Sequence, residues 1–507
     1  MSVAVRGPQP AQWKQAVARS TAAFAAGASF DLGFAPYGWW PMALLAPAAL
    51  FALIRGLPPR RAGWAGAAFG VGLFAFGTYW LYTCLHVFGL VPVWLTLILQ
   101  VVFVGAMSVY VAALCYLANR FWLKPGAIRD WLVLPALWVL LEWLRGWLLS
   151  GFPWLSAGYA MIDSPLAEWA PLLGVYGVTW AAVLISVAVN VVFMPGGSFA
   201  RRASSVAAAA ALLAVPLLMP RDWTQAVGPP IAVAAVQGAV PQDQKWQAKN
   251  RDLTMQRYLR LTDEAWGAQI IIWPEASLPA LSTELQDYLH RLKEQGHAHH
   301  ADFAIGLVDY LPQTKQYFNG ILVLSDAGDG WYYKRHLVPY GEYFPVPAFV
   351  RSWLRLMSLP YDDFTAGDAH QRLLTAAGQK LGMTICFEDA FGSAQLEALR
   401  QATLLVNVTN NAWYGDSTAP HQHLQIARMR ALEAGRYEVR AANDGITAVI
   451  DPRGKITASV AQFQEAVLRA TVQPMTGLTP YARVGNFPVV IGASLLLAFA
   501  VWRRRSG

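Results

Sequence analysis

Long apolar stretches, separated by loops that carry arginine and lysine, dominate the first 220 residues of the chain and return at its end. A helix needs about 20 apolar residues to cross a bilayer, and lipid admits only helices or closed barrels as spanning structures. The sequence therefore predicts a polytopic α-helical membrane domain with eight spans, of which the first two are short and bounded by proline. The candidate spans are Thr21–Ala35, Pro41–Ile54, Ala62–Leu85, Val91–Leu117, Trp131–Leu149, Glu168–Met194, Ser204–Met219 and Phe487–Trp502.

The composition agrees with a membrane protein rather than a soluble enzyme. Hydrophobic residues make up 55% of the chain and charged residues only 14%, and the 22 tryptophans suit side chains at membrane interfaces. The net charge of +8 could indicate nucleic-acid binding. Since the basic residues lie between apolar runs and at the chain end, membrane topology explains them better, and no nucleic-acid partner is expected.

Basic residues follow every second span, which is the positive-inside pattern. This pattern predicts that both termini are cytoplasmic and that everything between the seventh and eighth spans lies on the outer face. The first span could instead be a signal peptide, since Ala26-Gly27-Ala28 resembles a cleavage site, and cleavage would leave the outer placement unchanged. The basic residues are Arg6, Lys14, Arg19, Arg55, Arg60, Arg61, Arg120, Lys124, Arg129, Arg201, Arg202, Arg503, Arg504 and Arg505.

The predicted outer end of the fifth span carries two unusual features. Glu142 and Arg145 lie one helical turn apart, where a structural pair or a functional site at membrane depth is possible. The aromatic, glycine-rich loop Ser150–Tyr159 follows. This loop is either an interfacial aromatic belt or the floor of a lipid-facing cavity.

Beyond Arg221 the pattern changes to short β-rich runs alternating with helical segments, which predicts α/β layers around one core. We therefore divide the chain into a membrane domain (1–220), an α/β domain on the outer face (221–485) and a last span with a basic tail (486–507). Expected strands are Ile231–Val236, Gln269–Trp273, Phe303–Val308, Ile321–Leu324, Trp331–Tyr333, Leu381–Cys386, Thr403–Val408, Thr447–Ile450 and Ala466–Thr471. Expected helices are Ala248–Ala265, Glu284–Gln295, Ser393–Arg400 and His421–Tyr437.

An apolar segment, Gly341–Thr365, interrupts this pattern. It either fills the core of the domain or forms a mobile arm that dips into the membrane surface and admits a lipid.

Of three cysteines, only Cys386 lies in the polar half of the chain, so it has no disulfide partner there. It ends an apolar run and precedes Glu388, and it is either a packed core residue or a nucleophile at a strand end. A nucleophilic cysteine needs a base and a cation. Glu275 and Lys334 each follow another expected strand, and strands that end at one edge of a sheet bring such groups together.

The order of these residues resembles the nitrilase superfamily, in the contexts Trp-Pro-Glu275, Tyr-Lys334-Arg and Thr-Ile-Cys386-Phe-Glu388. Further matching stretches are Val236-Gln-Gly238, Lys245-Trp246, Val338-Pro-Tyr-Gly-Glu342-Tyr-Phe-Pro345, Asn410-Asn-Ala-Trp413-Tyr-Gly-Asp416 and His421–Ala431. Joined to eight spans, the whole chain is similar to the apolipoprotein N-acyltransferase family. The resemblance implies an α-β-β-α sandwich that works through a cysteine acyl-enzyme.

The resemblance also implies residue roles. Glu275 matches the base, Lys334 the oxyanion lysine and Cys386 the nucleophile, while Glu342 and Glu388 match accessory acids. Tyr340 lies in the Glu342 motif, and Trp246 and Trp413 match aromatic positions linked to substrate or arm packing. Two positions depart from the family pattern: Phe387 stands where tyrosine often follows the cysteine, and Asn411 where some members carry aspartate.

The implied reaction moves the sn-1 acyl chain of a phospholipid, phosphatidylethanolamine, onto Cys386 as a thioester. The chain then passes to the α-amine of the diacylglyceryl-cysteine of an apolipoprotein, the last step of lipoprotein maturation in the bacterial inner membrane. We expect a monomer without cofactor or metal, since no acid or cysteine accompanies His297, His299 and His300 at ligand spacing. Two alternatives remain: a membrane-tethered carbon–nitrogen hydrolase, and a transporter with an inactive domain.

Overall fold

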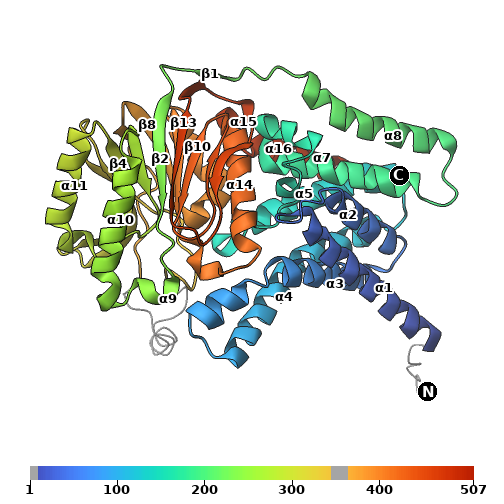
Figure 1. The fold of residues 1–507 in the computed structure, drawn as a ribbon. Helices are drawn as coiled ribbons and strands as arrows, with labels where there is room; N and C mark the ends of the chain where they lie inside the picture. Colours follow the sequence, from blue (N-terminus) through green and yellow to red (C-terminus); the bar gives the residue numbers. More distant parts are fainter. Residues whose placement is uncertain (1–9, 344–362, 507) are drawn as a thin grey trace.

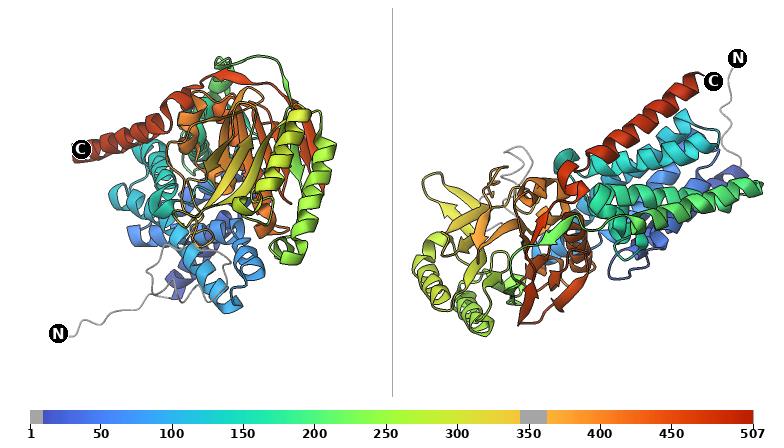
Figure 2. Two further views of the ribbon diagram at one scale, coloured as in Figure 1. Left: turned by 90° about the vertical axis from the view of Figure 1, so that its left-hand side faces the viewer. Right: turned by 90° about the horizontal axis from the view of Figure 1, so that it is seen from above.

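The computed structural model describes residues 10–343 and 363–506. A bundle of helices forms one half of the molecule and an α/β part with two large sheets forms the other (Figure 1). Both termini lie at the end of the bundle that is distant from the α/β part (Figure 2). Most of the predicted arm, residues 344–362, lies outside the described residues.

A helix occupies the place of each of the eight predicted spans. By length and composition, four helical segments among the described residues could cross a membrane: Val93–Phe121, Pro165–Val192, Phe199–Leu218 and Phe487–Arg505. The number of eight crossings therefore stays a prediction. The bundle helices are α1 (Pro10–Phe30), α2 (Met42–Leu53), α3 (Pro59–Gly77), α4 (Val93–Phe121), α5 (Leu134–Arg145), α6 (Ala157–Ala160), α7 (Ala170–Val192), α8 (Phe199–Ala214) and α16 (Phe487–Arg505).

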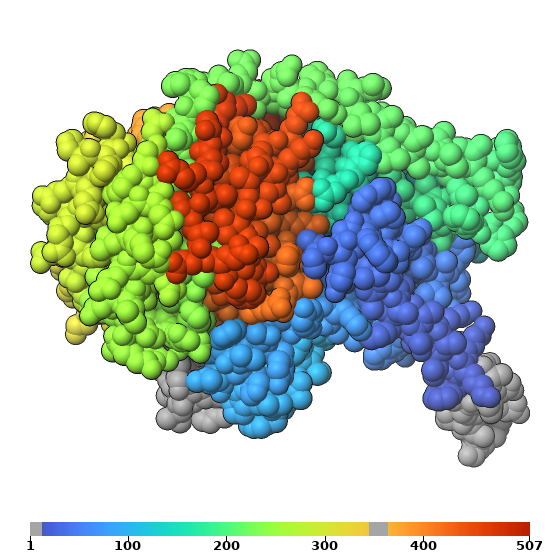
Figure 3. All heavy atoms as spheres, in the orientation of Figure 1, coloured from blue at the N-terminus to red at the C-terminus, as the bar shows by residue number. Residues whose placement is uncertain are grey.

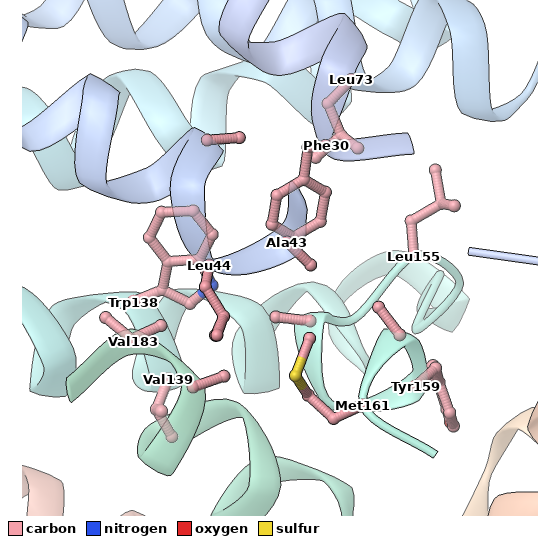
Figure 4. Packing of buried hydrophobic residues seen from close by; sticks show 14 of the residues in the cluster. Phe30, Ala43, Leu44, Leu73, Trp138, Val139, Leu155, Tyr159, Met161 and Val183 are labelled. Carbon is pink, nitrogen blue, oxygen red and sulfur yellow. The ribbon is translucent and has the colours of Figure 1, made fainter. Parts of the chain in front are cut away.

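Small and aromatic residues pack the bundle. A Cβ at Gly66 of α3 would lie 2.6 Å from the Val111 carbonyl oxygen of α4, so only glycine allows the two helices to come so close. The Trp138 ring lies 6.2 Å from that of Phe30 and 6.3 Å from that of Phe69, among the buried residues of Figure 4. The outer side chains of α4 are apolar and exposed, Val101 by 71%, as suits a surface that faces lipid.

Two six-stranded sheets form the centre of the α/β part. One has the order β13-β2-β3-β4-β5-β6 and the other β12-β11-β10-β9-β8-β7. Each contains three neighbouring parallel strands, β2-β3-β4 and β8-β9-β10, flanked by antiparallel ones. The strands are β1 (Thr224–Ala226), β2 (Ile231–Gln237), β3 (Ile270–Trp273), β4 (Asp302–Leu311), β5 (Gln316–Leu324), β6 (Gly330–Tyr333), β7 (Leu374–Ala376), β8 (Gln379–Ile385), β9 (Leu404–Thr409), β10 (Glu438–Ala442), β11 (Thr447–Ile450), β12 (Ile456–Val460), β13 (Ala466–Val472) and β14 (Met475–Gly477).

The two sheets pack face to face, and helices cover both outer faces. Val233 and Ile272 of one sheet share a buried cluster with Met383 and Val406 of the other. The helices are α9 (Gln242–Lys245), α10 (Arg251–Ala265) and α11 (Gln286–Ala298) on the first sheet's side, and α13 (Gly392–Leu399), α14 (Ala419–Ala434) and α15 (Pro480–Val484) on the second's. The predicted α-β-β-α sandwich is therefore confirmed.

Several details of the sequence-based prediction are wrong, and β1, β7, β12 and β14 were not among the expected strands. The strand expected to end at Cys386 ends at Ile385, because Cys386 begins a short 3-10 helical turn, Cys386–Ala390. The helix expected to reach Tyr437 ends at Ala434, where Gly435 takes a left-handed conformation and caps it. β10 was missed because Glu438 and Arg440 interrupt its apolar pattern, although both are fully buried.

Helix α14 joins the α/β part to the bundle. Leu424, Ala427 and Ala431 pack on strand β11, while Met429 and Leu432 belong to the main core of the bundle. Two hydrogen bonds reinforce the contact. The Val175 N–H of α7 donates to Glu433 Oε1 at 2.6 Å, and Trp154 Nε1 donates to Gln422 Oε1 at 2.7 Å. The two halves meet along a continuous boundary in Figure 3.

Candidate active site

The functional residues expected from the sequence follow the ends of strands in both sheets. Glu275 comes just after β3, the central parallel strand of the first sheet, and Lys334 directly follows β6 in the same sheet. Cys386 directly follows β8, and Asn410 directly follows β9, in the second sheet. Side chains at the carboxyl ends of parallel strands gather where α/β proteins bind their ligands. The face-to-face sheets thus bring groups distant in sequence to one edge.

Glu275, Lys334 and Glu342 form a buried charged cluster. Lys334 Nζ lies 2.8 Å from Glu342 Oε1 and 3.5 Å from Glu275 Oε1. Burial disfavours the charged form of Lys334, but the carboxylates of Glu342 and Glu275 outweigh it and raise the pKa of Lys334. Lys334 therefore keeps its proton at neutral pH and acts as a fixed cation.

Asn319 of β5 and Asn410 hold the two carboxylates in place. Asn319 Nδ2 donates to Glu275 Oε1 at 2.7 Å and to Glu342 Oε1 at 2.8 Å, while the Asn410 N–H donates to Glu275 Oε2 at 2.8 Å. Behind them, Lys245 Nζ donates to the Glu275 carbonyl oxygen at 3.3 Å. Burial lowers the pKa of Lys245 to about 8. Asn319 gave no sequence signal as a functional residue, because it precedes the apolar run from which β5 was predicted.

The Glu275 loop needs a glycine beside it. A Cβ at Gly306 of the neighbouring strand β4 would lie 2.7 Å from the Glu275 Cα. The Ser277 N–H donates to the Gly306 carbonyl oxygen at 2.8 Å, which fixes the loop against β4. The carboxylate is thus positioned by the backbone on both sides of the loop.

Cys386 lies in a strained position at the start of its turn. Its φ of 51° is in the left-handed region, which costs free energy for a residue with a side chain and is typical of functional sites. Only 7% of the residue is exposed. Burial raises the pKa of the Cys386 thiol to about 12, the negative charge of Glu275 adds to this, and the Lys334 cation opposes it. The free thiol is therefore neutral at pH 7, and attack requires its proton to be taken by a base.

Glu388 fastens the Cys386 turn to the loop after Lys334. Its Oε2 accepts a hydrogen bond from the Ile385 N–H at 2.8 Å and another from the Tyr332 hydroxyl at 3.0 Å. Its Oε1 accepts from the Arg335 N–H at 2.6 Å. Burial raises the pKa of Glu388 despite these bonds. Its oxygens bond to backbone and tyrosine groups that join the Cys386 turn to the loop after Lys334.

Phe387 makes an aromatic contact with the bundle. Its ring stacks on Trp154 at 6.2 Å and on Phe152 at 6.4 Å, both in the loop Ser150–Tyr159. That loop is held by Arg145, whose Nη1 donates to the carbonyl oxygens of Phe152 and Trp154 at 2.6 Å. Among the ion pairs of the described residues, none joins Arg145 to Glu142.

Glu142 instead fixes the helices around the loop. It accepts from Thr179 Oγ1 at 2.7 Å and from the Ala157 N–H at 3.2 Å. Glu142 and Arg145 thus do not pair with each other but bond separately to the loop Ser150–Tyr159. Trp154 of this loop stacks on Phe387 in the Cys386 turn.

The remaining accessory residues are placed around the cluster rather than in it. Tyr340 is 53% exposed and has a left-handed φ of 62°. Trp246 is half-buried next to Lys245, and Trp413 is 37% exposed in the turn Asn411–Tyr414. The next residue, Tyr414, packs edge-on against Trp80 of the bundle at 5.1 Å. Among the described residues, no group of three or more His, Cys, Asp or Glu side chains could hold a metal ion.

Family profiles match both halves of the chain. The profile of the apolipoprotein N-acyltransferase N-terminal domain matches residues 26–188, and that of carbon–nitrogen hydrolase matches residues 232–481. A protein of Methylococcus capsulatus named apolipoprotein N-acyltransferase is 39% identical over 489 residues, which cover 95% of this chain and 96% of the relative. One of Azotobacter vinelandii with the same name is 39% identical over 502 residues, which cover 96% and 95%. The chain belongs to the apolipoprotein N-acyltransferase family.

Membership of the apolipoprotein N-acyltransferase family decides between the alternatives left open by the sequence. It makes the chain an acyltransferase of lipoprotein biosynthesis built on the nitrilase-like fold, and it disfavours both a carbon–nitrogen hydrolase and a transporter. Among solved structures, yeast Nit3, a member of branch 10 of the nitrilase superfamily, aligns with a TM-score of 0.38 and 19% identity. The alignment covers 49% of this chain and 93% of that one.

Proposed function

We propose that the chain moves the sn-1 acyl chain of a phospholipid to the α-amine of the diacylglyceryl-cysteine of an apolipoprotein, through a thioester on Cys386. The observation that carries this proposal is the placement of a neutral, buried thiol under the influence of both Glu275 and the fixed cation Lys334. We assign Glu275 as base, Lys334 as oxyanion partner and Cys386 as nucleophile.

The first half-reaction forms the thioester. Glu275 takes the Cys386 proton as the sulfur attacks the ester carbonyl carbon, and the Lys334 ammonium stabilises the oxyanion that forms. The carbon–oxygen bond then breaks, and Glu275 returns the proton to the departing lysophospholipid oxygen. Because burial raises the pKa of the Cys386 thiol, the sulfur needs a base to take its proton, and Glu275 fills this role.

The second half-reaction releases the acyl chain. The amine nitrogen of the lipoprotein cysteine attacks the thioester, Glu275 takes the amine proton, and the carbon–sulfur bond breaks. Glu275 then reprotonates the Cys386 sulfur, so the enzyme returns to its resting state and the acceptor holds an amide. Exclusion of water keeps the thioester for the amine.

The membrane bundle explains why the substrates are lipids. The aromatic loop behind Phe387 belongs to the bundle, so the nucleophile lies close to the bilayer that contains donor and acceptor. We extend the proposal to eight spans, cytoplasmic termini, the three-part division at 220 and 485, the periplasmic side of the bacterial inner membrane, a monomeric state and phosphatidylethanolamine as donor. Glu342, Glu388, Tyr340, Trp246, Trp413 and Phe387 position the catalytic groups and substrates.

The direct test is to trap the acyl-enzyme. Purified protein incubated with phospholipid labelled in the sn-1 chain should gain a label that hydroxylamine releases. The Cys386→Ala variant should gain none, and label on this variant would remove the cysteine from its assigned role. Donors labelled in the sn-2 chain, or with other head groups, separate the finer assignments from the reaction itself.

A further inference from the structure

An arginine-rich cluster lies at the end of the bundle that is distant from Cys386. Asp130 interacts with Arg129 at 3.1 Å, Arg201 at 3.3 Å and Arg55 at 3.9 Å. Within the described residues, no other carboxylate pairs with these three arginines. The cluster therefore carries three positive charges and one negative charge, and the Asp130 side chain is only 3% exposed.

Two donors of this cluster are unused. Arg55 Nε and Arg129 Nε are both buried, and neither has a hydrogen-bond partner in the described structure. A buried donor without a partner costs free energy, and excess positive charge at membrane depth costs more. Arg55 uses its Nη2 to bond to Asn190 Oδ1 at the end of α7, which leaves the Nε to face another acceptor. Arg55 lines a groove on the bundle surface and Arg129 does not, so Arg55 is the member of the cluster to which an anion with acceptor oxygens can bind.

The apolar lining of a groove beside Arg55 indicates that this anion is a lipid. Its volume is about 510 Å³, and it lies between α2 and the end of α7. Arg55 and Asn190 form its polar end, and all other lining side chains are apolar. They are Leu45, Ala48, Ala49, Ala52, Val189, Phe193, Met194 and Pro195. A free anion would use the polar end only, whereas a lipid would fill the apolar length as well.

We propose that the groove between α2 and α7 binds an anionic phospholipid, with the phosphate at Arg55 and an acyl chain along the alanines of α2. The lipid comes from the leaflet opposite the α/β part, because the Ala35 N–H, before α2, donates to Gln425 of α14, whereas Arg55 lies just beyond the far end of α2. Basic pockets between membrane helices bind anionic head groups in this way. The site is remote from Cys386 and does not depend on the acyl-transfer reaction. A lipid with one net negative charge offsets one of the two excess positive charges of the cluster.

Native mass spectrometry of the full-length protein in detergent tests the site with defined lipids. Phosphatidylglycerol should bind the wild-type protein about tenfold more tightly than phosphatidylethanolamine, since it brings a net negative charge to the arginine cluster. The Arg55→Gln variant, which loses a charge-assisted bond to phosphate, should lose about tenfold in phosphatidylglycerol affinity. Ala49→Trp fills the groove without changing charge and should weaken binding as strongly.

Arg60→Gln is the matched control, because it removes one basic charge from the same end of the bundle outside the groove. It should bind phosphatidylglycerol as the wild type does, and equal loss in this variant would reduce the effect to general electrostatics and overturn the site. Glycerol 3-phosphate should not compete, and full competition would show a free-phosphate site instead. If Arg55→Gln does not fold, wild-type binding by Ala49→Trp alone overturns the proposal.

Discussion

The two central sheets share one strand pattern but contribute different parts of the candidate active site. The first sheet supplies Glu275, Lys334 and Asn319, which are bound to one another by short hydrogen bonds and one ion pair. The second supplies Cys386 on a strained turn, and its neighbour Phe387 stacks on a loop of the membrane bundle. The charges are thus fixed mainly by the first sheet, with one hydrogen bond from the Asn410 N–H of the second, whereas the Cys386 turn also has support from outside the domain.

This difference between the two sheets corresponds to two requirements of the proposed reaction, fixed charges and access to lipid substrates. Electrostatic stabilisation needs groups that do not move during the reaction, and a hydrogen-bonded network centred on the first sheet provides them. In the proposed reaction Cys386 must meet lipid substrates, and its turn contacts a loop of the membrane bundle. Substitutions on the two sides should therefore have distinct effects.

Removal of the cation should have the largest effect. In Lys334→Met the Glu275 and Glu342 carboxylates lose their shared cation and the oxyanion loses its partner, so kcat for acyl transfer should fall by about a thousandfold. The matched control is Lys380→Met, which removes an exposed lysine of β8 that bonds to Gln401. Turnover with labelled phospholipid measures both. Near-normal kcat in Lys334→Met would contradict the assignment of this network to catalysis.

Loss of the bundle support should have the next largest effect, and only on the nucleophile side. Trp154 is 1% exposed, and its replacement by alanine should leave a cavity behind Phe387 that costs about 3 kcal/mol. Thioester formation should slow by up to about a hundredfold, since the Cys386 turn is no longer held. Trp147→Ala is the control, because Trp147 is 51% exposed near the same loop. Equal rates in both variants would show that the loop does not position the cysteine.

Replacement of Asn319 should lower kcat less than removal of the Lys334 cation. Asn319→Ala removes the donor shared by Glu275 and Glu342, and about tenfold of kcat should be lost with little change in KM, the effect of one hydrogen bond to a charged group. Asn319→Gln, which keeps the amide, should recover part of the rate. Without such recovery, the effect of the alanine variant would be structural rather than positional.

The smallest expected effect is a loss of folding stability at acid pH. It depends on His336, which lies where the loops of the two sheets meet. The His336 ring stacks on Phe391 at 3.6 Å, and burial lowers the pKa of His336 to about 4. Between pH 6.5 and 4 the unfolded state binds more protons than the folded state, so stability falls as the pH falls. From pH 6.5 to 5.5 this amounts to about 1 kcal/mol.

Thermal unfolding at both pH values measures this dependence. His336→Phe should reduce the pH dependence by this amount, while the rest stays because burial also lowers the pKa of His423 and His421. His290→Gln, at a 73% exposed side chain, should keep all of it. An unchanged pH slope in His336→Phe would assign the acid sensitivity to other groups.

The sequence predicted the parts of this architecture that depend on local patterns. Apolar runs such as Ile270–Trp273 marked the strands, and Glu275 and Lys334 were found because each follows such a run. Asn319 and β10 were missed for one reason: both place polar side chains in a buried strand, where only contacts with distant residues satisfy them. The stacking of Phe387 on Trp154 joins residues more than 200 positions apart, which no local pattern can show.

The membrane spans also show what local sequence patterns cannot establish. Helices occur where the apolar runs predicted them, but α2 and α5 have only 12 residues each. The length of such a helix does not identify it as a membrane span. Its neighbouring helices and flanking charges do. The count of eight thus depends on the arrangement of the bundle more than on hydropathy.

Helix α14 has no face left for water. One side covers β11, and the other, with Met429 and Leu432, is sealed against the bundle. A soluble version of the catalytic part would expose that second side and aggregate through it. For the same reason, two fragments produced by cleavage after α8 would stay attached to each other. A water-soluble variant of the α/β part would first need polar side chains on the side of α14 that now contacts the bundle.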